Sequence, residues 1–287
     1  MDASLYFTGG IHFVLIKYFD NSAPLCYTVA MKKKPFYEVI HSDDSMVVLN
    51  KKSGVLVAAD RYDSEAPRLD TEASKEFGQL FAVHRIDKDT SGIVLYARTP
   101  EAHQNLSLQF QNRSIKKRYH ALVNGRPAWQ NIRVDLKLLP DGDNQHRTVV
   151  NRKNGKYSVT DFTLLGVCPP YSWIEACPIT GRTHQIRAHL NAKGLSIVCD
   201  PLYGGNLHPV RLSEIKRSWR GDPFEERPLL SRLALHAYEI TVAHPLTGEK
   251  RCFTAPYPRD MEAVRKQLAK IYNIDPLAIV TDGASIE

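Results

Sequence analysis

Short apolar runs alternate with polar turns from about residue 36 to residue 256, a spacing typical of β-strands. Residues 37–40 and 46–49 predict two strands joined by a polar turn, and the continuous apolar run 93–97 predicts a buried strand. The same signals predict further strands at 81–83, 118–123, 158–166, 171–177, 233–242 and 251–254. The last four ranges form two hairpins, one around Pro169-Pro170 and one around the turn 245–248.

Helical signals are fewer and lie between or after these strands. Residues 71–77 predict a short helix that ends at Gly78, and Thr99 predicts the cap of a helix whose first residue is Pro100. Thr183 is expected to cap a third helix. A last helix has one apolar face, made of Met261, Val264, Leu268 and Ile271. The pattern therefore indicates an α+β fold, with a mixed, mainly antiparallel sheet and peripheral helices, and not a doubly wound parallel fold.

The pattern also divides the chain. Residues 1–35 have weak periodicity and predict an N-terminal extension, residues 36–272 predict one folded domain, and residues 273–287 predict a C-terminal tail. Met31 precedes three lysines and is either the true start or the head of a basic arm. Because no run is apolar enough to span a membrane and no secretion leader is seen, we expect a cytoplasmic protein without membrane contact.

Charge and cysteine content narrow the class of partner. Lys and Arg total 38 against 31 Asp and Glu, which gives a net charge of +7. This excess favours a polyanion such as nucleic acid, although enzymes of small anionic substrates share it. The five cysteines include no CxxC pair, so we expect reduced thiols and neither a disulfide framework nor a zinc site.

The densest chemistry lies in residues 84–92, His-Arg-Ile-Asp-Lys-Asp-Thr-Ser-Gly, between two apolar strands. Polar groups packed there are costly unless they form a functional site or a hydrogen-bonded turn, and both interpretations are open from these residues alone. Arg85 and Lys88 favour the ionised form of Asp87. An anionic carboxylate in a pocket can act as a nucleophile or a base.

This segment resembles the H-R-L-D-x-x-T-S-G signature of RluA-type pseudouridine synthases, with Ile86 in place of leucine. Four later segments resemble the family's other motifs in the same order. They are residues 117–125 (K-R-Y-H-A-L-V-N-G), 180–190 (T-G-R-T-H-Q-I-R-A-H-L), 200–205 (D-P-L-Y-G-G) and 235–237 (L-H-A). Five ordered matches over residues 36–256 make a chance resemblance implausible.

The resemblance implies an isomerase that converts specific uridines of ribosomal or transfer RNA to pseudouridine. In that family Asp87 matches the essential aspartate, Tyr119 the tyrosine that stacks on the flipped-out base, and Arg187 the basic partner of the aspartate. The implied substrate-binding residues are His84, Arg85, Lys117, Arg118, Arg182 and His184. Because the reaction neither adds nor removes an atom, no cofactor and no metal are expected. The resemblance also implies a catalytic domain that acts as a monomer.

Physical chemistry supports these roles. A base must leave its stack before its C1′ or C5 can be reached, and a tyrosine ring beneath it offsets part of that cost. An arginine beside the aspartate keeps the carboxylate anionic and oriented. The sequence leaves open whether Asp87 attacks C1′, attacks C6 or assists removal of the C2′ proton.

Some features depart from the family or favour other readings. Lys52 stands where the family has proline, and residues 1–35 are too short for the S4 RNA-binding domain of many relatives. His184 and His189 are five residues apart, so they do not share a helical face and we expect His189 to be structural.

Two alternative functions remain. One is a magnesium-dependent phosphohydrolase that uses Asp87 and Asp89, which predicts a parallel sheet. The other is a non-catalytic RNA-binding module, which would be favoured by the loss of Asp87, Tyr119 or Arg187; all three are present.

Overall fold

The computed structural model describes residues 3–8, 11–16, 35–59, 66–204 and 208–278. The chain divides into two units, residues 1–35 and 36–287. In the first unit β1 (Ala3–Thr8) pairs with β2 (Ile11–Ile16) in antiparallel fashion, in a segment whose weak periodicity predicted no strands. The proposed start at Met31 and the basic arm after it lie outside the described residues.

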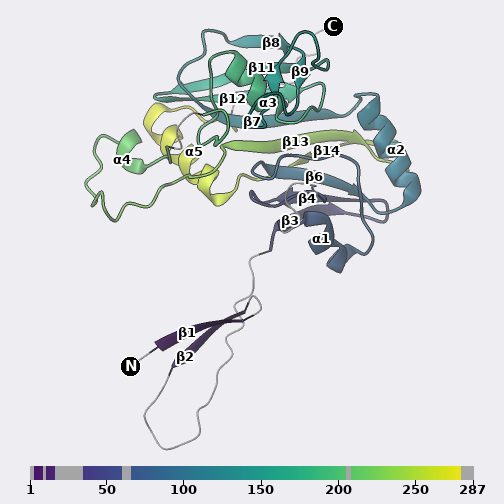
Figure 1. The fold of residues 1–287 in the computed structure, drawn as a ribbon, viewed down its shortest axis with the longest axis horizontal. Helices are drawn as coiled ribbons and strands as arrows, with labels where there is room; N and C mark the ends of the chain where they lie inside the picture. Colours follow the sequence, from purple (N-terminus) through teal and green to yellow (C-terminus); the bar gives the residue numbers. More distant parts are fainter. Residues whose placement is uncertain (1–2, 9–10, 17–34, 60–65, 205–207, 279–287) are drawn as a thin grey trace, which may run out of the picture. The chain divides into compact units, whose positions relative to one another are not determined.

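One ten-stranded sheet forms the second unit (Figure 1). Its strands are β3 (Tyr37–Ser42), β4 (Met46–Lys51), β5 (Phe81–Ala82), β6 (Ser91–Ala97), β7 (Lys116–Asn124), β8 (Asn131–Asp135), β11 (Val159–Cys168), β12 (Tyr171–Pro178), β13 (Leu235–Ala243) and β14 (Lys250–Thr254). The order is β3-β4-β6-β13-β7-β12-β11-β8, with β5 beside β6 and β14 beside β13. Only β6 and β13 run parallel among the described pairs, which confirms the mixed, mainly antiparallel α+β fold.

Helices pack on the sheet and bury its core side chains in separate clusters. They are α1 (Leu69–Phe77), α2 (Pro100–Gln111), α3 (Gln185–Ala192), α4 (Leu212–Ile215) and α5 (Arg259–Tyr272). The buried residues of β4 and β6 pack with α1 and α2, and those of β7 and β12 pack with α3 and α5. A small pair, β9 (Leu138–Leu139) with β10 (Val149–Val150), lies beside α3. The strand β13, which joins β6 to β7, contributes to all three large clusters through Leu235, Ala237 and Ile240.

The starts of α2 and α3 show where a capping residue in the sequence predicts the beginning of a helix correctly and where it does not. Thr99 caps α2 as expected, since its side chain accepts a hydrogen bond from the Ala102 backbone N–H. The prediction that Thr183 caps α3 is wrong: His184 occupies the cap position with φ 51°, and α3 starts at Gln185. The Gln185 side chain instead turns back and accepts from the Arg182 backbone N–H at 3.0 Å.

The C-terminal helix follows its apolar pattern in part. Met261, Val264 and Leu268 are buried, whereas Ile271 is exposed. After the helix, Ile274 and Leu277 pack against the core.

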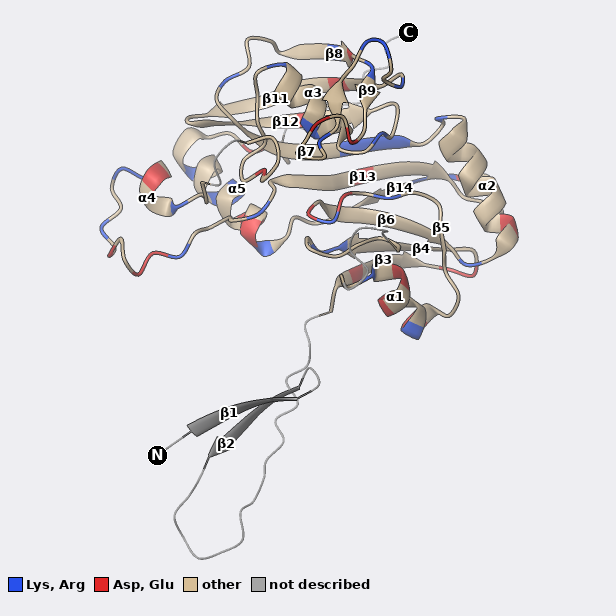
Figure 2. Ribbon diagram, viewed as in Figure 1, with Lys and Arg blue, Asp and Glu red and all other residues tan. Residues whose placement is uncertain are grey.

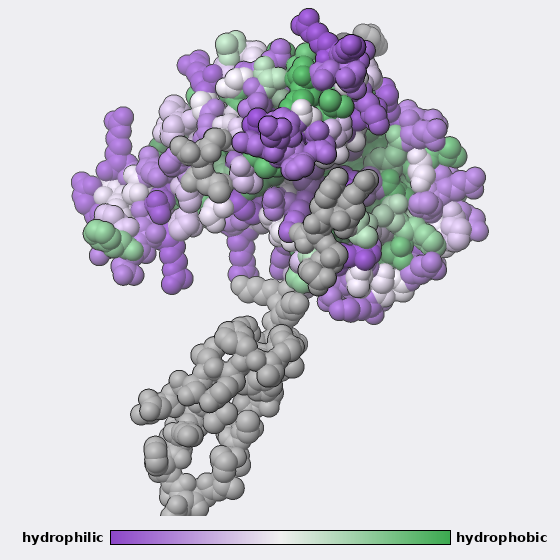
Figure 3. Space-filling model, in the orientation of Figure 1, coloured by the Kyte–Doolittle hydropathy of each residue, from purple (hydrophilic) through white to green (hydrophobic). Residues whose placement is uncertain are grey.

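The surface of the second unit carries positive and negative side chains, and both hydrophilic and apolar areas. Figure 2 shows lysines and arginines gathered at the start of β7, and Figure 3 shows hydrophilic side chains over most of the visible face, interrupted by apolar areas. Among the described residues, no helix has the length and apolar character needed to cross a bilayer.

Candidate active site

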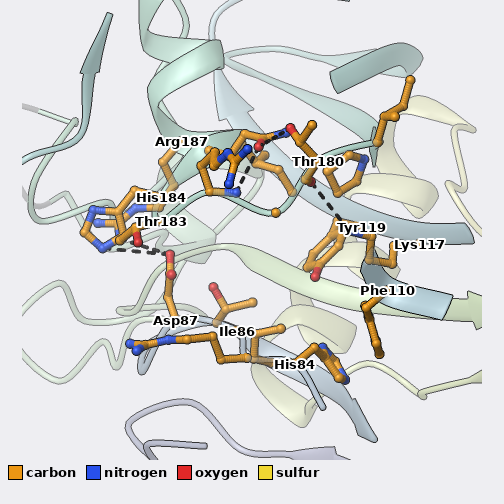
Figure 4. Close-up of a pocket in the computed structure, with 18 of the residues that line it drawn as sticks. His84, Ile86, Asp87, Phe110, Lys117, Tyr119, Thr180, Thr183, His184 and Arg187 are labelled. Atoms are coloured by element: carbon orange, nitrogen blue, oxygen red, sulfur yellow. Dashed lines mark hydrogen bonds and ion pairs between the residues drawn. The ribbon is translucent and has the colours of Figure 1, made fainter. Parts of the chain in front are cut away.

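A cavity of about 490 Å³ lies beside the start of β13, where Leu235 lines it. Three segments line it: residues 83–90 before β6, residues 110–119 from the end of α2 into β7, and residues 178–187 from the end of β12 into α3. Figure 4 shows Asp87, His184 and Arg187 toward one end, with Lys117, Phe110 and His84 toward the other and Tyr119 between them. Three motifs distant in sequence therefore form one pocket.

A buried lysine, Lys51, holds the backbone of the loop that carries Asp87. Lys51 has no exposed surface, and its Nζ donates to the backbone carbonyls of Lys52, Val55 and Lys88 at 2.8–2.9 Å. Burial lowers the pKa of Lys51 to about 7, against the attraction of Asp89 and Asp87. Three carbonyl acceptors match the three N–H donors of an ammonium group, so Lys51 ties this loop to the end of β4.

The end of the motif, Thr-Ser-Gly, explains how the loop enters the sheet. Ser91 Oγ lies 3.0 Å from His236 Nδ1, and Gly92 pairs with Ala237 in the parallel register between β6 and β13. At Gly92 φ is 110°, and a Cβ atom there would stand 2.2 Å from the Ala237 carbonyl oxygen. Only glycine allows this close approach of the two strands.

Asp87 belongs to a charged chain that runs inward from the pocket. Arg187 donates from Nη1 to Asp87 Oδ2 at 3.3 Å, and from Nε and Nη2 to the two carboxylate oxygens of Asp200 at 2.8 Å. The exposed fraction of the side chain is 25% for Asp87, 3% for Arg187 and 0% for Asp200. Burial opposes the charge of Arg187, but the hydrogen bonds to Asp200 outweigh it and raise the pKa of Arg187 above its usual value.

This arrangement assigns different roles to the two carboxylates. Asp200 forms the two-pronged contact that fixes the guanidinium plane, and Asp200 Oδ1 also accepts from the backbone N–H groups of Leu202 and Tyr203. The centre of the Tyr203 ring lies 5.1 Å from the guanidinium carbon of Arg187. Asp87 receives the remaining Nη1 donor and faces the pocket, so its other oxygen can address a substrate.

His184 lines the pocket beside Asp87. Its Nε2 lies 4.0 Å from Asp87 Oδ2, and its Nδ1 lies 3.3 Å from the Tyr203 hydroxyl. Burial lowers the pKa of His184, with Asp87 acting in the opposite sense. By contrast, His189 is buried away from the pocket, 3.0 Å from Thr160 Oγ1, which fits a structural role.

Tyr119 lies in the middle of the pocket. Burial, reinforced by the charge of Asp87, raises the pKa of Tyr119 above its usual value, so the phenol stays neutral at physiological pH. Its neighbour Lys117 faces the same pocket, where its Nζ is 3.5 Å from the Thr180 carbonyl oxygen, and burial lowers the pKa of Lys117 to about 8. Thr90 adds a buried hydroxyl without a hydrogen-bond partner at the pocket wall.

Arg118 does not join them, and this placement corrects the expectation that it contacts substrate. Successive side chains of a strand point to opposite faces, so Arg118 points away from the face of Lys117 and Tyr119. It pairs with Glu175 at 2.5 Å and with Glu239 at 3.1 Å. The sequence showed the alternation but not which face holds the pocket.

The other expected contacts line the cavity in different ways. Arg85 is exposed at the pocket, and Arg182 donates from Nε to the Tyr157 carbonyl at 3.2 Å. His84 is more constrained: its Nε2 accepts from the Leu95 backbone N–H, its ring stacks on Phe110, and burial lowers its pKa to about 3. His84 therefore serves as a neutral, fixed wall residue of the pocket.

Sequence reasoning missed three residues of this site: Asp200, Gln185 and Lys51. Asp200 directly follows the apolar run 197–199, and a carboxylate in such a place is buried only beside a cationic partner, which is the signal that could have found it. Gln185 accepts from Thr180 Oγ1 and donates to the Val159 carbonyl, which ties the loop before α3 to β11. Nothing in the local pattern indicated that bridge.

The comparisons with known proteins identify the family. The sequence model of the RNA pseudouridylate synthase family matches residues 45–192. Ribosomal large subunit pseudouridine synthase D of Zymomonas mobilis is 35% identical over 243 residues, covering 80% of this chain and 72% of that one. Dual-specificity RNA pseudouridine synthase RluA of Haemophilus influenzae is 34% identical over 227 residues, covering 77% of this chain and 94% of that one. A Neisseria meningitidis synthase D is 33% identical, and the match spans 59% of its length.

Solved structures agree on the fold. Human RNA Pseudouridylate Synthase Domain Containing 4 aligns with a TM-score of 0.60 at 24% identity, covering 80% of this chain and 92% of that one. Human RNA Pseudouridylate Synthase Domain Containing 1 gives 0.59 at 24% identity, covering 79% and 87%. The chain belongs to the RNA pseudouridylate synthase family, and it is an isomerase that acts on uridine in RNA.

The family and the fold also decide between the alternatives. The phosphohydrolase hypothesis required a parallel sheet with Asp87 and Asp89 in one site, but the sheet is mainly antiparallel and Asp89 does not line the cavity. The non-catalytic module was favoured only if a key residue were lost, and Asp87, Tyr119 and Arg187 all line one pocket.

Proposed function

We propose that the enzyme isomerises specific uridines of ribosomal or transfer RNA, with Asp87 as the catalytic carboxylate acting on a flipped-out nucleoside. The observation that carries this proposal is the 3.3 Å contact between Asp87 and the buried Arg187 at the wall of the cavity. The relatives named for the ribosomal large subunit and for dual specificity support the choice of RNA.

The pocket supplies what the rearrangement needs. The C1′–N1 bond breaks, the uracil turns, a C1′–C5 bond forms, C5 loses its proton and N1 gains one, so no group is gained or lost. Asp87 faces the nucleoside as an anion held by Arg187, and the Tyr119 ring provides a surface on which the extruded base stacks. The neutral Tyr119 hydroxyl can relay the proton that leaves C5 once the C1′–C5 bond has formed, while N1 gains a proton.

The remaining pocket residues divide into phosphate contacts and walls. Lys117, Arg182 and Arg85 are cationic and line the cavity, so we assign them to the RNA backbone around the target. His184 and His84 shape the two ends of the cavity. We further propose that residues 36–272 form the catalytic domain, flanked by an extension (1–35) and a tail (273–287). We also propose that the enzyme works as a monomer in the cytoplasm, where its RNA substrates are made.

Tritium release tests this function directly. RNA labelled with tritium at C5 of uridine loses the label to water when C5 forms its bond to C1′. We expect release from ribosomal or transfer RNA isolated from a strain that lacks the gene, in excess chelator as well as without it. An active preparation of wild-type enzyme that releases no tritium from either RNA would contradict the proposal.

Replacing Tyr119 with phenylalanine separates binding from chemistry. The ring remains for stacking but the hydroxyl is lost, so we expect kcat to fall about 10²-fold while the Kd for RNA changes less than about twofold. Tyr238→Phe is the matched control, because Tyr238 stacks on His120 on the other face of β7 and should retain full turnover. Equal losses of binding and turnover in Tyr119→Phe would count against a proton-transfer role.

The lowered pKa of Lys117 predicts a pH dependence. The ammonium form is needed to hold a phosphate, and it is lost as pH rises through about 8, so kcat/KM should decline above that pH in the wild type. In Lys117→Met this decline should vanish and kcat/KM should be low throughout. Lys116→Met serves as the control, because Lys116 is exposed and does not line the cavity; it should retain the wild-type profile. A decline that persists unchanged in Lys117→Met would assign it to another group.

A further inference from the structure

Tyr157 is an aromatic residue beside the pocket that no motif of the sequence marks. It follows a surface turn and lies two residues before β11, and 46% of its surface is exposed. The guanidinium carbon of Arg113 lies 5.3 Å from the centre of its ring, and Arg182 donates to its backbone carbonyl. Because Arg113 and Arg182 both line the cavity, Tyr157 lies at the rim of the active site.

The position of Tyr157 is fixed by the same bonds that organise the active site. Val159 donates from its backbone N–H to Thr180 Oγ1 at 3.0 Å, and its carbonyl accepts from Gln185 Nε2 at 2.9 Å. Gln185 is the first residue of α3, which carries Arg187. The backbone beside Tyr157 is therefore tied to the segment that carries Arg187, and the ring stands on the surface next to it.

The electrostatic surroundings of the ring favour an anionic partner. Neither Arg113 nor Arg182 forms an ion pair with a carboxylate in the part of the chain that the structure describes. Lys153 and Lys156, four and one residues before Tyr157 in the sequence, are exposed. A guanidinium over an aromatic face, with no carboxylate to neutralise it, is an arrangement that holds single-stranded nucleic acid by stacking and charge together.

We propose that Tyr157 is a stacking platform for a base that adjoins the target uridine, and that Arg113 and Arg182 hold the phosphates between the two nucleotides. This inference rests on the proposed function, because it takes the cavity as the site of the extruded uridine. The open part of the ring receives the neighbouring base while the pocket holds the target. Such a platform selects RNA whose strand is opened at the target, since a base that remains paired cannot reach the ring.

Binding and turnover of three variants test the platform. The binding probe is a fluorescein-labelled decauridylate, in which target and neighbour are both uridine, followed by anisotropy; turnover is followed by tritium release from RNA of the deletion strain. In Tyr157→Ala we expect Kd and KM to rise about fivefold to hundredfold with kcat within about twofold. Tyr157→Phe keeps the ring and should match the wild type. Phe224→Ala removes an aromatic residue that is 96% exposed and does not line the cavity, and it should also match the wild type.

Three results would overturn the platform. They are an unchanged Kd and KM in Tyr157→Ala, an equal loss in Tyr157→Phe, and tighter binding in Tyr157→Ala, which would mean that the Tyr157–Arg113 contact closes the pocket mouth. Failure of the proposed function has a different signature: the wild type would release no tritium, and the anisotropy of the same variants would still decide whether Tyr157 binds RNA.

Discussion

Replacing Asp87 with asparagine is expected to lower kcat by at least about 10³-fold, because an amide can act neither as a nucleophile nor as a base at this position. The fold should persist, since Arg187 keeps both hydrogen bonds to Asp200. RNA binding should persist as well, because Tyr119 and Lys117 are untouched. Single-turnover tritium release with a parallel binding titration measures the two effects separately.

Asp89→Asn is the matched control for this experiment. Asp89 lies two residues away in the same loop, but it does not line the cavity, and Ser53 Oγ bonds its backbone carbonyl and not its side chain. We expect turnover close to that of the wild type. Retained turnover in Asp87→Asn, or an equal loss in Asp89→Asn, would show that the loop matters without Asp87 being its reactive group.

Replacing Asp200 with asparagine is expected to give the largest loss of stability. The guanidinium of Arg187 would remain buried without the charge of Asp200 and with one of its two 2.8 Å bonds to that side chain lost, and removal of one partner from a buried ion pair costs about 3–5 kcal/mol of the free energy of unfolding. Turnover should also fall in the folded fraction, because Arg187 would no longer be held against Asp87. Urea unfolding at constant temperature measures the first effect, and kcat at low temperature measures the second.

An exposed pair of the same geometry provides the comparison. Arg133 donates to both oxygens of Asp161 at 2.7 and 2.8 Å, but the side chains of Arg133 and Asp161 are 64% and 40% exposed. Asp161→Asn should leave unfolding nearly unchanged, since water screens and replaces the contact. If Asp200→Asn unfolded like Asp161→Asn, the Asp87–Arg187–Asp200 chain would not be the structural centre of the site.

The elements of this fold could be predicted where the local pattern decides them. The run 93–97 is a central strand, Thr99 caps α2, and Met261, Val264 and Leu268 make the buried face of α5. In each case a periodicity or a capping residue acts within a few positions. Thr183 fails as a cap for the opposite reason: Gln185 is drawn to β11 by contacts with Thr160 and Val159, and those distant partners set where the helix begins.

The residues of the candidate site also fall into two groups: those that a local motif marks and those that depend on contacts between distant segments. Asp87, Tyr119 and Arg187 could be proposed because each stands in a motif, and the structure brings them to one cavity. The sequence could not show that Arg118 lies away from the pocket, because it does not reveal which face of β7 lines the cavity. Asp200 needed knowledge of a contact with Arg187 across 13 residues of chain, and Tyr157 became visible only when the structure placed Arg113 over its ring.

The central claim is that this chain makes pseudouridine in RNA through Asp87. Chemical mapping of pseudouridines in total RNA from a gene-deletion strain, complemented with the wild type or with Asp87→Asn, tests it most directly. We expect one or a few positions of ribosomal or transfer RNA to lose the modification, and we expect the wild type but not Asp87→Asn to restore them. An unchanged map in the deletion strain, or full restoration by Asp87→Asn at wild-type protein levels, would contradict it.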